Sequence, residues 1–298
     1  MFVADAHCDA LYRMAAETGQ ERFVTMETLR AGGVGVQALA MFAGTDENRG
    51  FHRVGPMLEA LRAFGAPVLT GDLPETPPRE PHAVVTVEGG ELFEGSVDRL
   101  RELDGTVRVR MLGLTWNFEN ELGYPALGGA KEGLKARGRA FLREMGRLRI
   151  LADVSHLNEA GFWDVCEYSL LPPVASHSDC RWLCGAKRNL TREQARAIIE
   201  RGGFIGINFC PEFLHESGAA TIDDVVRHID ALMELGGENC VGFGSDFDGI
   251  SSAPEGLSSP ADFPRVLEAL ARRGYGQDQL EKIAGRNLYR LLRRTNRA

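Results

Sequence analysis

Residues 83–90 read Ala-Val-Val-Thr-Val-Glu-Gly-Gly, a run of apolar and β-branched side chains that ends in one carboxylate and two glycines. A short apolar run without polar alternation predicts a strand that is buried on both faces, as in a parallel sheet. Glu88 at its tip has two interpretations. It is either a solvated turn residue or helix cap, or a carboxylate that bridges two metal ions, because an unpaired buried carboxylate would be costly.

Seven further runs of this kind alternate with segments that have the periodicity of amphipathic helices. The eight predicted strands span residues 2–6, 34–42, 83–87, 107–115, 150–154, 173–176, 204–208 and 240–244. The predicted helices span residues 53–64, 97–103, 131–147, 159–166, 192–201, 222–235, 260–273 and 278–293. Such alternation predicts an α/β fold, namely a (β/α)8 TIM-type barrel of the metal-dependent hydrolase kind with C-terminal helices. Residues 1–298 are expected to form a single catalytic domain, and Thr191 and Thr221 to cap helices.

The composition is that of an ordinary globular protein, with 44% hydrophobic and 26% charged residues. Thirty-four basic and 42 acidic residues leave a net charge of -8, which would repel a phosphate backbone, so nucleic acid is not an expected partner. We expect a cytoplasmic protein without a membrane anchor, because no signal-peptide pattern or long apolar run occurs. The six cysteines are scattered, and the C-x3-C pair Cys180 and Cys184 lacks the second pair of a zinc finger.

Residue types that bind metal ions recur just after the predicted strands. His7 and Asp9 follow the first strand, Glu88 the third, His156 the fifth and His177 the sixth. The carboxyl ends of barrel strands share one mouth, so these side chains are expected to converge there. Each histidine alone is more often a structural residue than a ligand. Together the five side chains predict two zinc ions that share a carboxylate and keep positions open for water.

The predicted eighth strand continues into Ser245-Asp246-Phe247-Asp248-Gly249. The carboxylate of Asp246 would lie over the metal ions, where it could accept a proton from water and pass it to a leaving amine. Asp248 is the competing candidate for this base. Its other interpretation is an Asx-turn residue before Gly249.

Seven short motifs occur in order along the whole chain. They are H-x-D at His7, V-E-G-G at Glu88, V-S-H-L at His156, S-H-S at His177, R-N-L at Arg188, F-G-S-D-F-D-G at Phe243 and G-R-N-L-Y-R-L-L at Gly285. This series resembles the membrane (renal) dipeptidase family of amidohydrolase-like metallopeptidases. The resemblance implies that His7, Asp9 and Glu88 hold one zinc ion. It implies that Glu88, His156 and His177 hold a second.

The resemblance also implies roles for residues that bind no metal. Asp246 would be the catalytic, proton-shuttling base, and Arg188 would clamp the free carboxylate of a dipeptide through its planar guanidinium. The family's Leu-Thr-His element, whose histidine contacts the scissile carbonyl region, reads Leu-Thr-Trp116-Asn117 here. An indole can donate a hydrogen bond but cannot become a cation. We therefore expect Trp116 and Asn117 to bind the substrate in an altered way; the alternative is that Trp116 only packs the pocket wall.

The implied activity is that of a zinc-dependent dipeptidase, a metallopeptidase and hydrolase. A hydroxide held between two zinc ions would attack the amide bond of a dipeptide, including one with a D-residue at its C-terminal position. One alternative is a binuclear metal hydrolase of N-acyl amino acids or related amides and lactones, which Trp116 favours. Another is a catalytically silent metal-binding barrel, against which Asp246 and Arg188 argue. The family further suggests a homodimer.

Overall fold

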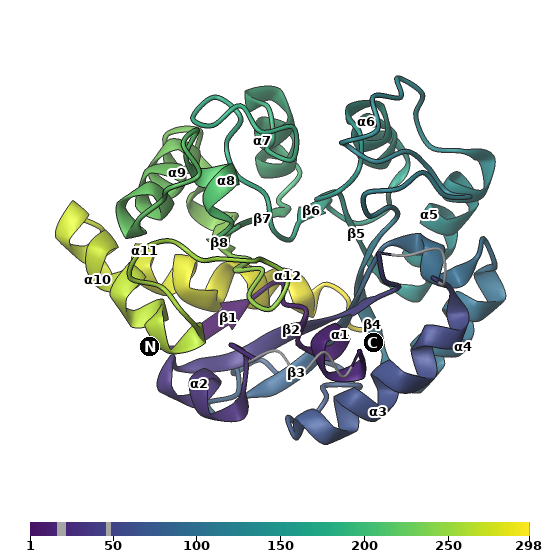
Figure 1. Cartoon of the computed structure of the whole chain (residues 1–298), viewed down its shortest axis with the longest axis horizontal. Coiled ribbons are helices and arrows are strands. Elements are labelled where there is room, and N and C mark those ends of the chain that lie inside the picture. The colour runs from purple at the N-terminus through teal and green to yellow at the C-terminus, as the bar shows by residue number, and fades with distance from the viewer. Residues whose placement is uncertain (17–21, 46–48, 298) are drawn as a thin grey trace.

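The computed structural model describes residues 1–16, 22–45 and 49–297. Eight parallel strands close into a barrel in sequence order, and helices surround it (Figure 1). The strands are β1 (Val3–Asp5), β2 (Val34–Phe42), β3 (His82–Glu88), β4 (Val109–Gly113), β5 (Leu151–Asp153), β6 (Val174–Ala175), β7 (Phe204–Ile207) and β8 (Val241–Phe243). Each strand overlaps its predicted range. The predicted (β/α)8 barrel is therefore confirmed.

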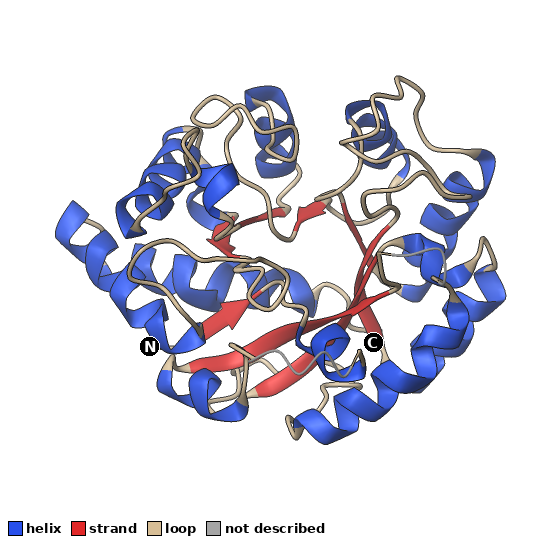
Figure 2. Cartoon of the chain, viewed as in Figure 1, coloured by secondary structure: helices blue, strands red, loops and turns tan. Residues whose placement is uncertain are grey.

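Helices connect the strands on the outside of the barrel (Figure 2). They are α1 (Ala10–Ala15), α2 (Met26–Ala31), α3 (Val54–Phe64), α4 (Val97–Val107), α5 (Ala136–Leu148), α6 (Glu159–Tyr168), α7 (Arg192–Glu200), α8 (Pro211–Leu214), α9 (Ile222–Glu234), α10 (Phe263–Arg273), α11 (Gln277–Glu281) and α12 (Asn287–Arg293). A π-helical turn (Lys282–Arg286) joins α11 to α12. The predicted C-terminal helices are thus present, the second with an interruption.

The prediction differs from the structure at short helices, at one helix start and at one helix end. The helix predicted over residues 97–103 extends to Val107, so Val107 lies in α4 and not in the following strand. The prediction missed α1, α2 and α8, because helices of four to six residues are too short to show apolar periodicity. It began α5 at residue 131, whereas the helix begins at Ala136. The N–H groups before Ala136 make hydrogen bonds outside the helix. That of Leu134 donates to Asp164 Oδ2 at 2.6 Å, and that of Lys135 donates to Leu122 O at 2.9 Å.

Both predicted threonine caps are found. Thr191 Oγ1 accepts a hydrogen bond from the N–H of Gln194 at 3.2 Å, and the N–H of Thr191 donates to Gln194 Oε1 at 2.9 Å. The N–H of Thr221 donates to Asp224 Oδ2 at 2.9 Å. These contacts satisfy backbone groups at the starts of α7 and α9, so both helices begin where the sequence predicts.

Buried aspartate–serine contacts join the barrel where its backbone pairing is shortest. β8 meets β1 through one residue pair, at Asp5, and β5 meets β6 through one pair, at Asp153. The Asp5 carboxylate accepts hydrogen bonds from Ser245 N at 2.8 Å and Ser245 Oγ at 2.6 Å. Asp153 likewise accepts from Ser176 N at 3.0 Å and from Ser176 Oγ. Side-chain hydrogen bonds therefore supplement the strand pairing at the barrel mouth.

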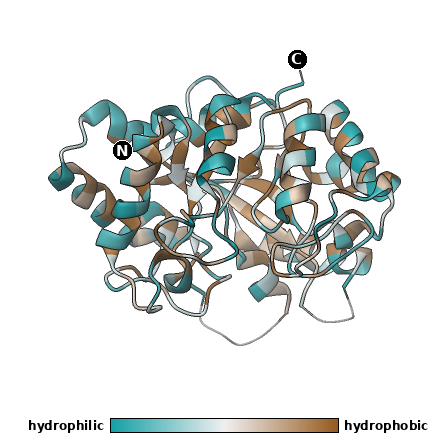
Figure 3. Cartoon of the chain, turned by 90° about the horizontal axis from the view of Figure 1, so that it is seen from above, coloured by the Kyte–Doolittle hydropathy of each residue, from teal (hydrophilic) through white to brown (hydrophobic). Residues whose placement is uncertain are grey.

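Apolar side chains fill the space between the barrel and its helices. In Figure 3 the strands at the centre are coloured as hydrophobic, and much of the outer helix surface as hydrophilic. Phe243 at the end of β8 stacks on Phe263 of α10 with 4.9 Å between the ring centroids. In the described residues, no helix combines the length and the apolar character needed to cross a membrane.

A buried histidine of α9, His228, is hydrogen-bonded to the segment after β6 and to the end of α8. His228 has no exposed surface, its Nδ1 lies 3.0 Å from the N–H of Cys180, and its Nε2 lies 3.0 Å from the carbonyl of Leu214. Nδ1 therefore accepts and Nε2 donates, which is the neutral form of the ring. Burial lowers the pKa of His228 from 6.5 to about 4.

His228→Gln is expected to reduce the pH dependence of the free energy of unfolding below neutral pH. Below about pH 6.5 the unfolded chain binds a proton that the folded chain takes up only near pH 4, so the free energy of unfolding falls by about 1.4 kcal/mol per pH unit as pH decreases through this window. Chemical denaturation of the metal-free protein between pH 7 and pH 5 measures the slope. His52→Gln, at an exposed histidine, serves as the control. Equal slopes in wild type and His228→Gln would contradict the prediction.

Candidate metal centre

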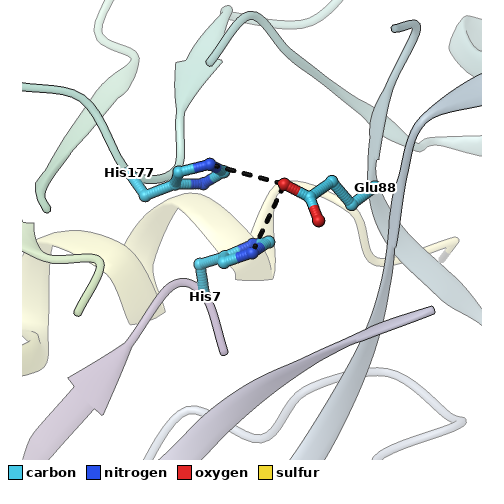
Figure 4. Close-up of side chains that lie close together, drawn as sticks. All are labelled: His7, Glu88 and His177. Atoms are coloured by element: carbon cyan, nitrogen blue, oxygen red, sulfur yellow. Dashed lines mark ion pairs between the residues drawn. The ribbon is translucent and has the colours of Figure 1, made fainter. Parts of the chain in front are cut away.

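The predicted ligands converge at the mouth of the barrel. His7 lies two residues after the end of β1, Glu88 is the last residue of β3, and His156 and His177 follow β5 and β6. In Figure 4 the rings of His7 and His177 and the carboxylate of Glu88 point toward one another. Asp9 precedes α1 as its N-cap. The side chains of His7 and Asp9 lie close together, with 3.4 Å between His7 Nε2 and Asp9 Oδ2.

Glu88 is the centre of the cluster. Its Oε1 lies 2.8 Å from Nε2 of His156, 3.6 Å from Nε2 of His177 and 3.7 Å from Nε2 of His7. The rings of His7 and His177 are nearly in contact, with 3.9 Å between their centroids. One oxygen of Glu88 therefore faces three imidazole nitrogens, and the three histidines follow three different strands.

A second group of carboxylates surrounds His7. Its Nε2 lies 3.4 Å from Asp9 Oδ2 and 3.7 Å from Asp246 Oδ1. One ligand atom from each of these three residues lies within 4.8 Å of the others, and the same holds for the set formed by His7, Glu88 and His177. The structure thus brings the predicted ligands into one continuous cluster in which His7 is common to both sets.

Burial sets the charge of this cluster. It lowers the pKa of His156 and His177 well below the usual value, so both rings are neutral. It raises the pKa of Glu88 well above its usual value, and the charge of Asp9 adds to this effect. Burial alone would lower the pKa of His7, but the carboxylates of Glu88 and Asp9 outweigh it and raise the pKa to about 10. The cluster is therefore an acidic site that favours a positive charge.

These residues fit a site for divalent cations. Nε2 of His156 and Nε2 of His177 face each other at 2.9 Å, and Nδ1 of His156 lies 2.9 Å from Asn117 Oδ1. An amide oxygen can only accept, so the proton of His156 is on Nδ1 and its Nε2 lone pair faces the cluster. Nε2 of His7 and Oδ1 of Asp9 are buried and have no hydrogen-bond partner in the described part of the chain. Nitrogen and carboxylate lone pairs that share one buried space form the donor set of a transition-metal ion such as zinc.

Asp246 lies beside this cluster in an unusual backbone conformation. Its φ is +62°, in the left-handed region that non-glycine residues seldom adopt, and this turns the chain sharply after β8. Asn208, which follows β7, donates from Nδ2 to Asp246 Oδ2 at 2.9 Å and leaves Oδ1 directed at His7. Burial raises the pKa of Asp246 to about 6. Sequence reasoning missed Asn208, although it occupies the same strand-end position as the predicted ligands.

Asp248 has a different environment from Asp246. Its carboxylate accepts hydrogen bonds from the N–H groups of Phe23 and Val24 at 2.9 and 3.2 Å. Arg13 Nε lies 3.7 Å from Asp248 Oδ1. The carboxylate therefore holds a distant loop rather than the local Asx turn that the sequence suggested, and these contacts occupy the oxygens that a general base would need.

Arg188 reaches the mouth from the loop between β6 and α7. Only 5% of its surface is exposed, and Nη1 has no hydrogen-bond partner among the described residues. The guanidinium lies over the ring of Phe213, 5.7 Å from the ring centroid. A buried guanidinium with an unpaired N–H group is costly, so this side chain is suited to an anionic ligand.

The mouth opens into a cavity of about 1060 Å³, and the four remaining predicted residues line it. These are Trp116, Asn117, Arg188 and Asp246. The indole of Trp116 packs on Phe42 with 4.8 Å between ring centroids, which fits the interpretation as pocket wall. The amide of Asn117 contacts His156 rather than pointing only into the cavity. Their predicted contacts with substrate stay predictions.

A closed βα barrel with histidines and carboxylates gathered at its mouth defines a metal-dependent hydrolase. The family model described as membrane dipeptidase, peptidase family M19, matches residues 1–298. The chain belongs to this family, so the resemblance seen in the sequence motifs is confirmed.

Individual relatives agree with this assignment. An uncharacterized protein of the pqqA 5′ region in Klebsiella pneumoniae is 38% identical over 220 residues, which cover 70% of this chain and 80% of that protein. An uncharacterized dipeptidase of Schizosaccharomyces pombe is 33% identical over 218 residues, which cover 72% of this chain and 53% of the yeast protein. A crystal structure of a Rhodobacter sphaeroides metallopeptidase, liganded with a phosphinate mimic of the dipeptide L-Ala-D-Ala, has a TM-score of 0.87 and 26% identity and covers 99% of both chains.

Glu88→Gln is expected to remove metal and activity together. An amide keeps the shape of the side chain but loses the charge that faces three imidazoles, so metal affinity should fall by more than the 10–100-fold typical for loss of an outer partner. Metal content after dialysis and peptide hydrolysis are the two measurements. Glu91→Gln is a matched control, since Glu91 is equally buried but binds Asn120 Nδ2 at 2.8 Å. A Glu88→Gln protein with wild-type metal content and activity would refute a bridging role.

Proposed function

We propose that this chain is a zinc-dependent dipeptidase that hydrolyses the amide bond of dipeptides. The main support is that three of the predicted ligands, Asp9, Glu88 and His156, line the same cavity as the buried guanidinium of Arg188, whose Nη1 has no hydrogen-bond partner among the described residues. The cluster suits activation of water, and the cation suits a substrate with a free carboxylate. Family membership supports both parts.

Five side chains would hold two zinc ions. They are His7, Asp9, Glu88, His156 and His177. Glu88 would be the shared carboxylate; this is supported by its Oε1, which faces histidines from both sides of the mouth. Bound zinc would supply Lewis acidity, which lowers the pKa of water toward neutrality and polarises the scissile carbonyl.

Asp246 would move the proton. One carboxylate oxygen faces the cluster, and the other is fixed by Asn208. A pKa of about 6 allows the carboxylate to accept a proton from the attacking water and to return it to the leaving amine near neutral pH. Asp246 therefore acts as general base and then as general acid.

Arg188 would set the direction in which the substrate lies. It follows β6, whereas Phe42 ends β2, on the opposite side of an eight-stranded barrel. A dipeptide with its carboxylate on Arg188 and its amide over Glu88 therefore extends toward the aromatic wall of Phe42 and Trp116. We propose that a D-residue is accepted at the C-terminal position, which the L-Ala-D-Ala mimic bound to the Rhodobacter relative supports for that protein.

Further parts of the proposal concern the protein as a whole. We propose that residues 1–298 act as one catalytic domain, because all eight strands contribute to one closed barrel. The six cysteines are free thiols, which is consistent with the expected cytoplasmic location. A homodimer is proposed from the family alone.

Arg188→Lys is expected to weaken recognition of the substrate carboxylate. Lysine keeps the charge but loses the planar fork, so kcat/KM for a dipeptide should fall by about 10–100-fold, with metal content unchanged. The ratio of kcat/KM for a dipeptide to that for its C-terminal amide isolates the carboxylate contact. Lys187→Met is the matched control, since Lys187 also lines the cavity but is exposed. An unchanged ratio in Arg188→Lys would exclude the clamp.

A second candidate function is hydrolysis of N-acyl amino acids, which the aromatic wall of Phe42 and Trp116 favours. Such substrates keep the carboxylate for Arg188 and replace the free amine by an apolar group. The zinc-loaded enzyme should be compared on L,L-dipeptides, L,D-dipeptides and N-acyl amino acids that share one C-terminal residue. We expect both dipeptides to be hydrolysed faster. Faster turnover of the N-acyl compounds would instead favour the second candidate.

A further inference from the structure

Ser176 contacts both a metal-ligand histidine and a buried carboxylate. Its Oγ lies 2.8 Å from Nδ1 of His177 and is hydrogen-bonded to Asp153 Oδ2. Ser176 is 1% exposed, His177 is 1% exposed and Asp153 is 8% exposed. The three groups therefore form a chain of hydrogen bonds from the end of β5 to the metal cluster, largely shielded from solvent.

The direction of each proton in this chain follows from its partners. Asp153 also accepts hydrogen bonds from Ser155 N, Ser155 Oγ and Ser176 N, so its carboxylate acts throughout as an acceptor. The hydroxyl of Ser176 must then donate to Asp153, and its oxygen is left to accept from His177. The proton of the His177 ring therefore lies on Nδ1, and Nε2 presents a lone pair to Glu88.

Neighbouring hydrogen bonds hold the main chain of His177 in place. The N–H of His177 donates to Ser155 Oγ at 3.1 Å, and that hydroxyl donates to Asp153 Oδ1 at 2.8 Å. Asp153 thus controls the main chain of His177 through one serine and its ring through another. His156 obtains the equivalent restraint on Nδ1 from Asn117, and within residues 1–16, 22–45 and 49–297 no carboxylate is hydrogen-bonded to this amide.

We propose that Ser176 and Asp153 are positioning residues that fix the tautomer and orientation of His177 for metal binding. The pair needs no contact with substrate. It acts by keeping Nδ1 protonated, which leaves Nε2 free for a cation and makes the imidazole a better donor. This inference rests on the proposed metal centre, and it goes beyond it by assigning roles to two residues that bind neither metal nor substrate.

Ser176→Ala tests the proposal. The expected result is a 10–100-fold weaker zinc affinity, measured by competition with a chromogenic chelator, because loss of an outer partner typically costs this much. Ser178→Ala is the matched control: Ser178 lies two residues away, is 1% exposed, and its Oγ has no hydrogen-bond partner among the described residues. It should bind zinc like the wild type. The thermal stability of the metal-free proteins separates lost affinity from lost folding.

A second measurement uses the wild-type protein, so it does not depend on whether a variant folds. In zinc-loaded wild type with 15N-labelled histidine, the Nδ1–H proton of His177 should give a protected ring resonance. Ser176→Thr, which keeps the hydroxyl, should preserve both this resonance and the zinc affinity. Zinc affinity in Ser176→Ala equal to that of Ser178→Ala, or a His177 ring protonated on Nε2, would overturn the inference. Failure of the wild type to bind zinc would instead refute the proposed metal centre itself.

Discussion

One carboxylate oxygen, Oε1 of Glu88, lies close to three imidazoles, and this arrangement sets the chemistry of the barrel mouth. Glu88 Oε1 lies within 3.7 Å of Nε2 in His7, His156 and His177, and all four residues are buried. Lone pairs forced together in a dry site repel one another and lose the hydration they would have in an unfolded chain. A bound cation would offset that cost, which is the physical reason why the cluster suits a metal ion.

The barrel holds this cluster by side-chain hydrogen bonds at the two junctions where strand pairing is weakest. Asp5 binds the backbone and hydroxyl of Ser245, and Asp153 binds the same groups of Ser176. Cluster residues lie next to each serine, Asp246 after the first and His177 after the second. A buried carboxylate with several donors is a rigid support, so small displacements of the ligands are resisted at both junctions.

The sequence was sufficient to predict the barrel, because parallel strands buried on both faces leave unbroken apolar runs. It was also sufficient to predict which side chains meet at the barrel mouth, because the carboxyl ends of barrel strands meet in space whatever their separation in the chain. The short helices α1, α2 and α8 could not be predicted, since they depend on tertiary contacts rather than periodicity. Neither could Asn208 or Ser176, because a lone amide or hydroxyl has no pattern that distinguishes a supporting contact from a surface one.

Trp116 shows where sequence and geometry lead to different conclusions. The sequence resemblance implies that Trp116 stands where the family has a histidine, and it therefore predicts altered chemistry at the scissile bond. In the structure its ring packs against Phe42 and lies 6.1 Å from the ring centroid of His156, so it excludes water from one side of the cluster. Exclusion of water strengthens every charge interaction inside the cavity. An indole in place of a titratable ring can donate a hydrogen bond but cannot transfer a proton, and its apolar face lowers the polarity of the cavity that Arg188 and Asp246 line.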